Sequence, residues 1–87
     1  MKIREISKIA KETGYNYYEY RHAHSSVIDP GYSRYLFKKE ITDGKNTIIV
    51  DKKDVNRIWF QTDYCDEKDI TMIKAAIKLA ETPIDER

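Results

Sequence analysis

Residues 34–50 read RYLFKKEITDGKNTIIV, in which two β-branched and aromatic runs flank an Asp43-Gly44 turn. An Asp-Gly pair between such runs is a strong short-range signal for a β-hairpin. Two loop lengths fit this signal, a loop of residues 43–44 or a loop of residues 43–46. With either loop, odd positions of the first strand pair with even positions of the second. The hairpin therefore predicts that one sheet face carries Tyr35, Phe37, Ile41, Ile48 and Val50.

A third strand is expected in the run RIWFQT at residues 57–62, which is rich in aromatic and β-branched residues. Strand alternation would place Ile58 and Phe60 on one side and Trp59 on the other. The three strands follow one another with short polar connections. This order predicts an antiparallel meander.

The stretch YNYYEYRHAH at residues 15–24 is compatible with two structures. As a strand, it places Tyr18, Tyr20, His22 and His24 on one face. As a helix, it would follow Ala10 and Gly14, whose spacing is that of a helix-turn-helix motif. Residues 6–27 would then resemble a DNA-reading unit, with Asn16 as the N-cap of its recognition helix. In that alternative the Asp43-Gly44 hairpin would serve as a wing.

Helical periodicity appears at both ends of the chain. Near the start, Ile3, Ile6, Ile9 and Ala10 form one apolar stripe, and Gly14 is placed to end the helix. The last helix is expected to begin at Asp66, capped together with Asp69, and to stop before Pro83. Its main stripe is Ile70, Ile73, Ile77 and Ala80, widened by Met72, Ala76 and Leu79, and residues 82–87 are expected to be a loose tail.

These patterns predict one α+β domain over residues 1–87. An antiparallel meander of three to four strands, from about residue 16 to 62, is flanked by an N-terminal and a C-terminal helix that pack on one sheet face. A chain of 87 residues is too short to divide its apolar side chains between two cores. The expected core is Ile3, Ile6, Ile9, Phe37, Ile48, Val50, Ile58, Phe60, Ile73 and Ile77.

Charge and cysteine content narrow the classes of function. The formal net charge of +1 argues against a strongly basic nucleic-acid binder and against an acidic DNA mimic. Cys65 is the only cysteine, so no internal disulfide can form. The first twelve residues alternate charge with isoleucine and contain no continuous apolar run, which is unlike a signal peptide or a membrane span. We therefore expect a cytoplasmic protein that makes no membrane contact.

Tyrosines interleaved with cations provide the main functional signal. Tyr, Trp and Arg are the residue types that anchor protein interfaces, and aromatic rings beside cations can also stack single-stranded bases. Both functions remain open at this point, as does the alternative that half of these rings are core. The candidate binding residues are Tyr17, Tyr18, Tyr20, Arg21, His22, Tyr32, Arg34 and Lys38.

Catalysis and metal binding have less support. His22 and His24, with Cys65, Asp63 or Asp66, could bind a transition metal, but the chain contains no second ligand pair at the usual spacing. The same histidines and Arg21 are residue types that a small ribonuclease uses, without any recognisable nucleophile motif. We therefore expect no enzyme, no metal and no cofactor.

Charge is unevenly distributed along the chain. Residues 34–57 contain seven cations and four acids, whereas residues 63–69 contain four acids and one lysine. Such a separation can orient a partner or pair two copies of the chain.

The end of the chain, AAIKLAETPIDER at residues 75–87, resembles the termini of small uncharacterised proteins of phages and prophages of Gram-positive bacteria. The resemblance implies a mobile-element setting, in which short accessory proteins usually bind and modulate another molecule. The expected function is accordingly a non-enzymatic modulator that acts on a host or phage protein. Nucleic acid, read by the helix-turn-helix-like residues 6–27, is the alternative partner, and a homodimer is a further option.

Overall fold

A computed structural model describes residues 1–21 and 33–87. Its elements follow in the order α1 (Ile3–Thr13), β1 (Asn16–Arg21), β2 (Ser33–Ile41), β3 (Gly44–Asp51), β4 (Ile58–Thr62), α2 (Glu67–Glu81) and the short 3₁₀ helix η1 (Ile84–Glu86). The strands form one antiparallel sheet in the order β1-β2-β3-β4. The predicted α+β meander between two terminal helices is confirmed, with four strands.

The segment that the sequence left open as strand or helix is a strand over Asn16–Arg21. It pairs with β2 along its whole length, from Asn16 opposite Lys38 to Arg21 opposite Ser33. The helix-turn-helix alternative requires a recognition helix that begins at Asn16, so its structural premise is wrong for these residues. The rest of that segment, residues 22–27, lies outside the described residues.

The β2–β3 hairpin has the predicted parity but a loop one residue earlier than expected. Ile41 pairs with Gly44, which leaves only Thr42 and Asp43 in the connection. Gly44 begins β3 with φ 158°, and a Cβ on it would collide with the carboxylate of Asp63. That carboxylate accepts a hydrogen bond from the Lys45 amide at 2.8 Å. The close approach of Asp63 therefore explains why glycine occupies the first position of the strand.

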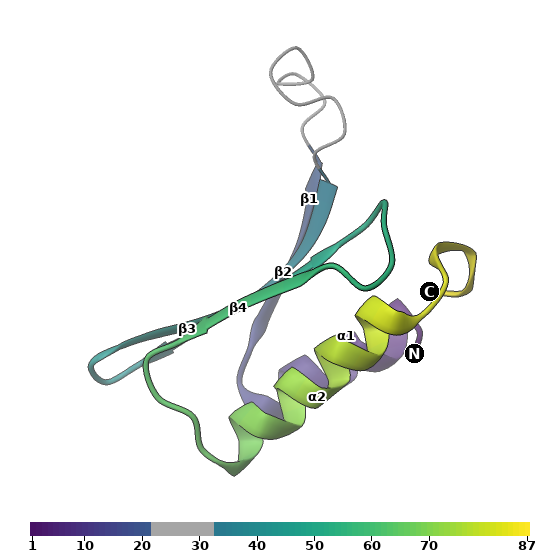
Figure 1. The fold of residues 1–87 in the computed structure, drawn as a ribbon. Helices are drawn as coiled ribbons and strands as arrows, with labels where there is room; N and C mark the ends of the chain where they lie inside the picture. Colours follow the sequence, from purple (N-terminus) through teal and green to yellow (C-terminus); the bar gives the residue numbers. More distant parts are fainter. Residues whose placement is uncertain (22–32) are drawn as a thin grey trace.

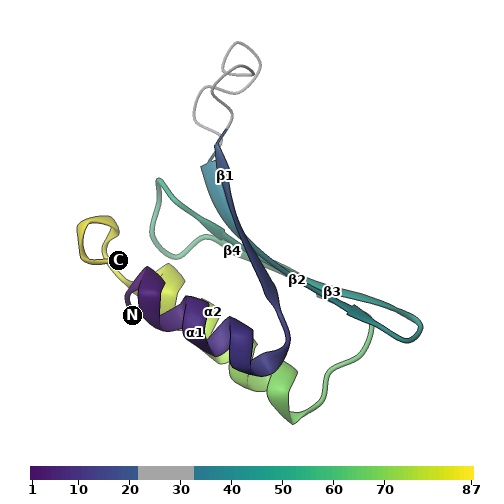
Figure 2. The same ribbon diagram turned by 180° about the vertical axis from the view of Figure 1, so that it is seen from behind.

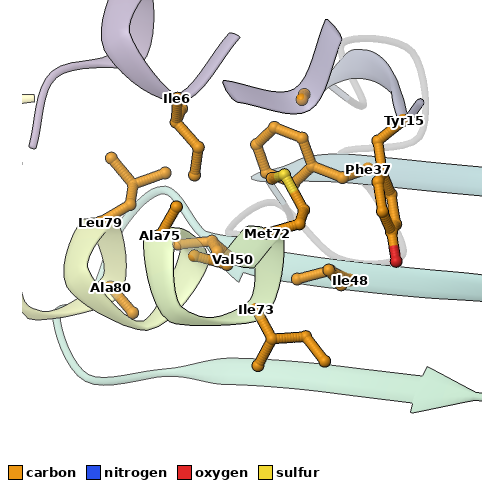
Figure 3. Close-up of a cluster of buried hydrophobic side chains, with 12 residues drawn as sticks. Ile6, Tyr15, Phe37, Ile48, Val50, Met72, Ile73, Ala75, Leu79 and Ala80 are labelled. Carbon is orange, nitrogen blue, oxygen red and sulfur yellow. The ribbon is translucent and has the colours of Figure 1, made fainter. Parts of the chain in front are cut away.

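Both helices cover the same face of the sheet (Figures 1 and 2), as predicted. Between the layers lies a continuous apolar core, to which the sheet contributes the fully buried Phe37, Ile48 and Val50 (Figure 3). The helices contribute small and medium-sized side chains, which let them approach the sheet closely. The buried helical residues of the core are Ile6, Ala10, Met72, Ile73, Ala75, Ala76, Leu79 and Ala80.

Five of the ten predicted core residues need correction. Ile3, Ile9 and Ile58 are only partly buried at the margin of the core. Phe60 is 52% exposed and Ile77 is 39% exposed. Phe60 is exposed because β4 is an edge strand and α2 packs mainly over β3. Ile77 lies outside the core because the buried stripe of α2 is centred on Met72, Ala76 and Leu79.

The helix ends follow the sequence signals. Gly14 ends α1 in the left-handed region at φ 89°, where glycine carries no steric cost. Asp66 caps α2 by accepting hydrogen bonds from the amides of Lys68 and Asp69, and the Asp69 carboxylate in turn accepts a hydrogen bond from the Asp66 amide. This reciprocal capping box is the one predicted. Within the described ranges, no helix is long and apolar enough to cross a membrane.

The C-terminal residues are folded back, not loose as predicted. The Arg87 guanidinium donates hydrogen bonds to the carbonyl oxygens of Thr82 at 3.0 Å, Asp51 at 2.6 Å and Ala80 at 3.2 Å. Carbonyls at the end of a helix lack partners within the helix, and a basic side chain satisfies them well. Arg87 therefore ties the end of α2 to the end of β3.

Candidate functional site

The face of the sheet turned away from the helices carries a row of apolar side chains that crosses all four strands. The register places Tyr18 opposite Leu36, Leu36 opposite Ile49, and Ile49 opposite Trp59. Tyr18 and Trp59, at the two ends of the row, are 48% and 49% exposed, and the two aliphatic side chains between them are half-buried. We call this surface the open face and these four residues the apolar row. An exposed contiguous apolar surface of this kind marks a binding site more often than isolated exposed side chains do.

Two arginine side chains lie over the ring of Trp59. The guanidinium of Arg34 is 5.9 Å from the ring centroid and that of Arg57 is 5.8 Å from it. Both distances fall in the range of cation–π attraction. Arg57 also forms an exposed ion pair with Asp54 at 3.1 Å. The aromatic end of the apolar row is therefore bordered by positive charge.

A polar row lies beside the apolar row. Asn16, Lys38, Thr47 and Gln61 are opposite one another in successive strands. A shallow groove runs over this part of the open face, lined by Arg34, Lys45, Thr47, Ile49, Trp59, Phe60 and Gln61. The arrangement is an apolar strip with polar and cationic margins. This is the anatomy of a protein interface, with an apolar centre and a polar rim.

The sheet divides the predicted binding residues between its faces. Tyr18, Arg34 and Lys38 occupy open-face positions in the register. Tyr17 does not, because its ring stacks on Phe37 at 5.2 Å between centroids and contacts Tyr35 at 6.3 Å on the helix-covered face. Tyr17 is therefore partly buried against the core on the helix-covered face, away from the open-face positions of Tyr18, Arg34 and Lys38.

The remaining predicted residues lie at or beyond the limits of the described structure. Tyr20 pairs with Arg34 and Arg21 with Ser33 through the backbone register. Since positions alternate along a strand, Tyr20 shares the register parity of Tyr18, and Arg21 that of Tyr17. His22 and Tyr32 lie outside the described residues, as does His24.

Sequence reasoning missed the centre of the open face. Leu36 and Ile49 were not among the candidates, although the hairpin parity that groups Phe37 with Ile48 also groups these two on the opposite face. Trp59 was assigned to the side away from Ile58 but to no site. The missing step was to follow the second face of the hairpin across to the next strand.

A second polar cluster lies on the helix-covered side, where α2 begins. The Asp69 carboxylate accepts hydrogen bonds from the Tyr15 hydroxyl and from Lys39 Nζ, both at 2.9 Å. Asn46, fully buried, donates to the Tyr15 hydroxyl at 3.3 Å and to the Tyr64 carbonyl at 2.7 Å. No buried side-chain polar atom in the described parts of the chain is without a hydrogen-bond partner.

The pKa values in this cluster fit a structural role. Burial raises the pKa of Asp69, but the hydrogen bonds from the Asp66 amide, Lys39 and Tyr15 outweigh it and lower the pKa to about 2. Burial also raises the pKa of the Tyr15 hydroxyl above its usual range, and the hydrogen bond to Asp69 adds to the increase. Asp69 therefore stays ionised and Tyr15 stays protonated at neutral pH. The cluster fastens α2 to the sheet.

The two histidines of the metal hypothesis, His22 and His24, lie outside the described residues. Across residues 1–21 and 33–87, no group of three or more His, Cys, Asp or Glu side chains is arranged to hold a metal ion. Cys65 is half-buried beside the core.

Fold and surface together define a two-layer α+β domain in which one sheet face is packed under helices and the other carries an exposed apolar row. Comparison with known proteins adds no family to this description: no protein-family model, no curated protein and no solved structure matches the chain.

Proposed function

We propose that the protein is a non-enzymatic binding module that docks a partner protein on the open face of its sheet. The observation that carries this proposal is the apolar row of Tyr18, Leu36, Ile49 and Trp59, which is exposed at both ends and crosses every strand. Aromatic side chains at the ends provide large contact area with few rotatable bonds, as interface anchors do. The resemblance of residues 75–87 to phage and prophage proteins supports a modulator of a host or phage protein.

The distribution of aromatic residues favours a protein partner over single-stranded nucleic acid. A nucleic-acid platform stacks successive bases on aromatic rings. Here the centre of the described open face is aliphatic, with Leu36 on β2 and Ile49 on β3, while the rings of Tyr18 and Trp59 lie on the outer strands β1 and β4. Aliphatic side chains at the centre match the apolar core of a protein interface better than a stacking surface.

Charge at the margin indicates the chemistry of the partner. Arg34, Lys38, Lys45 and Arg57 border the apolar row. Acids lie among these cations: Asp51 is opposite Arg34, Glu40 is opposite Lys45, Asp54 is paired with Arg57, and the Asp63 carboxylate accepts from the Lys45 amide. Complementary charge at the rim would orient the partner and accelerate its association. The partner surface expected from this pattern is an apolar patch bordered by acidic side chains.

The test is a selection from a random peptide library followed by titration of the selected peptides. Wild-type protein should enrich peptides that combine apolar and acidic residues, and Trp59→Ala should weaken their binding at least tenfold, the loss expected when an interface anchor is truncated (about 2 kcal/mol). When a selected peptide binds, the backbone amide NMR chemical shifts that change most should be those of open-face positions in β2, β3 and β4. Ile84→Ala is the matched control, because Ile84 is a similarly exposed apolar side chain in η1.

Two outcomes would contradict the proposal. One is selected peptides whose binding is equally strong to Trp59→Ala and to wild type. The other is salt-sensitive binding of single-stranded RNA or DNA that Trp59→Ala abolishes, since this would make the open face a nucleic-acid platform.

A further inference from the structure

The outer edge of β4 is an unprotected strand edge. In the described parts of the chain β4 pairs with β3 on one side only. The Asp51 amide donates to the Arg57 carbonyl at 3.1 Å, and hydrogen-bonded pairs alternate along an antiparallel ladder. Ile58, Phe60 and Thr62 are therefore the residues whose backbone N–H and C=O groups point away from β3. The five residues of this edge, Ile-Trp-Phe-Gln-Thr, include no proline and no charged residue. Prolines and charged side chains are the usual means by which an edge strand blocks the addition of another strand.

Exposed apolar side chains flank the same edge on the helix-covered side. Phe60 is 52% exposed, and on α2 Ile70 and Ile77 are 44% and 39% exposed. These two isoleucines lie three residues before and four residues after Ile73, which points from α2 toward β4 in Figure 3. Helical spacing therefore places Ile70 and Ile77 on the side of α2 nearest β4. The edge carries both unpaired backbone groups and an apolar patch.

We propose that a second copy of the chain docks on this edge, with the two β4 strands paired antiparallel about a twofold axis at Phe60. This register pairs Ile58 with Thr62 of the partner subunit and brings the two Phe60 rings together. It uses all five residues of β4, and the outward backbone groups of Ile58, Phe60 and Thr62 meet their equivalents, as a hydrogen-bonded antiparallel pair requires. Shifting the pairing by two residues in either direction shortens the overlap.

Charge complementarity supports a second copy as the occupant. In the Phe60-centred register, the residue that precedes β4 on one copy lies opposite the residue that follows β4 on the other. These residues are Arg57 and Asp63, both exposed and of opposite charge. Within one copy Arg57 forms a surface ion pair with Asp54, and Asp63 accepts from the Lys45 amide. The symmetry produces the pairing of Arg57 with Asp63 twice, once at each end of the joined strands. An isologous interface needs such self-complementarity, because each patch must match its own copy.

The dimer unites the two four-stranded sheets into one continuous sheet. The open faces then lie on the same side, and Trp59 of each copy is opposite Gln61 of the other. The patch of Phe60, Ile70 and Ile77 is covered on the other side, where the two α2 helices approach each other. This inference does not use the apolar row: it rests on the backbone edge, the helix-side patch and the pairing of Arg57 with Asp63, of which only Arg57 is shared with the margin of the proposed partner site.

Sedimentation velocity over a wide concentration range tests the association. Wild type should shift from monomer to dimer by mass action, Phe60→Lys should remain monomeric, and Arg57→Glu should raise the dissociation constant several-fold because it places like charges opposite Asp63. Ile84→Lys is the matched control, an exposed apolar residue of η1 that should dimerise like wild type. A wild-type protein that stays monomeric at its highest soluble concentration would overturn the inference.

Cysteine cross-linking tests the register. In a Cys65→Ser background, Phe60→Cys places two thiols at the twofold axis, within the Cα separation that a disulfide spans. Thr62→Cys is the control, because its two copies lie about 14 Å apart along the paired strands. Oxidation should cross-link Phe60→Cys and leave Thr62→Cys uncoupled. Preferential cross-linking of Thr62→Cys, or of neither variant while wild type dimerises, would show that β4 is not the joined edge.

Discussion

Ile48 and Ile49 are adjacent in β3, yet they belong to different environments. Ile48 is fully buried under the helices with Phe37, whereas Ile49 is half-buried in the apolar row of the open face. The same residue type therefore contributes to the core at one position and to an exposed surface at the next. The helix-covered face provides the buried core, whereas the open face leaves apolar area exposed to solvent.

The two faces also differ in how their polar groups are satisfied. On the covered side, Asp69, Tyr15, Lys39 and Asn46 are joined in one hydrogen-bonded cluster. On the open face, Arg34 and Arg57 lie over an exposed indole ring, and Arg57 is also paired with Asp54 at the surface. Polar groups thus fix the structure on one side and border a binding surface on the other.

The largest expected effect on stability comes from truncating an isoleucine on each face of the sheet. Ile48→Ala should lower the free energy of unfolding by about 2–5 kcal/mol, because it leaves a cavity in a fully buried site. Ile49→Ala should cost about 1 kcal/mol or less, since a half-buried side chain loses less apolar contact. Urea denaturation followed by circular dichroism measures both. Equal losses would mean that the open face is as much a part of the core as the covered face.

An intermediate effect is expected from pH, through the cluster on the covered side. The pKa of Asp69 falls from 3.8 to about 2 on folding, so the native state binds fewer protons between these values. Its contribution, on the order of 2 kcal/mol, is complete above the unfolded pKa and is lost as the pH falls through the folded pKa. Thermal unfolding of wild type should therefore show a steep loss of stability below pH 4.

Asp69→Asn provides the control for this pH dependence. The variant should be less stable than wild type at neutral pH, because Lys39 and Tyr15 lose a charged acceptor. Its stability should change less with pH over the same acidic interval, since the titrating group is gone. If wild type and Asp69→Asn lose stability in parallel, other carboxylates control the acid transition.

The smallest effect concerns Trp59, the only tryptophan in the chain. Its half-exposed ring should be accessible to ionic quenchers in the folded protein, and the ratio of iodide to caesium quenching should exceed that of a free tryptophan amide because Arg34 and Arg57 are close. Arg57→Gln should lower this ratio, whereas Lys74→Gln, an exposed change on α2, should not. A ratio equal to that of the free amide would mean that the arginines do not set the local potential.

Local signals predicted much of this fold. Strand parity follows from Asp43-Gly44, the capping box from Asp66 and Asp69, and the end of α1 from Gly14, because each depends on neighbouring residues alone. The exact hairpin loop was missed because Asp63, nineteen positions beyond Gly44, is what approaches the backbone there. The exposure of Phe60 was missed because it depends on which strand is at the edge and where α2 lies.

The candidate site was only partly predictable for the same reason. Choosing tyrosines and cations by residue type selected Tyr18, Arg34 and Lys38, which occupy open-face positions. The same criterion selected Tyr17, which packs on Phe37. The apolar row became visible only once the registers of three strand pairs were combined, because its members come from four separate segments. By sequence, Asn46 resembled a turn residue. In the structure it is fully buried, and its side chain hydrogen-bonds the Asp63 amide and the Tyr64 carbonyl.

The helical layer is built from the two ends of the chain, and this affects the order of folding. Each strand pairs with its neighbour in sequence, so the sheet can form from local contacts that close quickly. The core must wait for α2, the last helix, which packs beside α1 across almost the whole chain length (Figure 2). During synthesis, the apolar face of Phe37, Ile48 and Val50 therefore stays uncovered until α2 has emerged from the ribosome, and in that interval the chain is most exposed to aggregation and to chaperones.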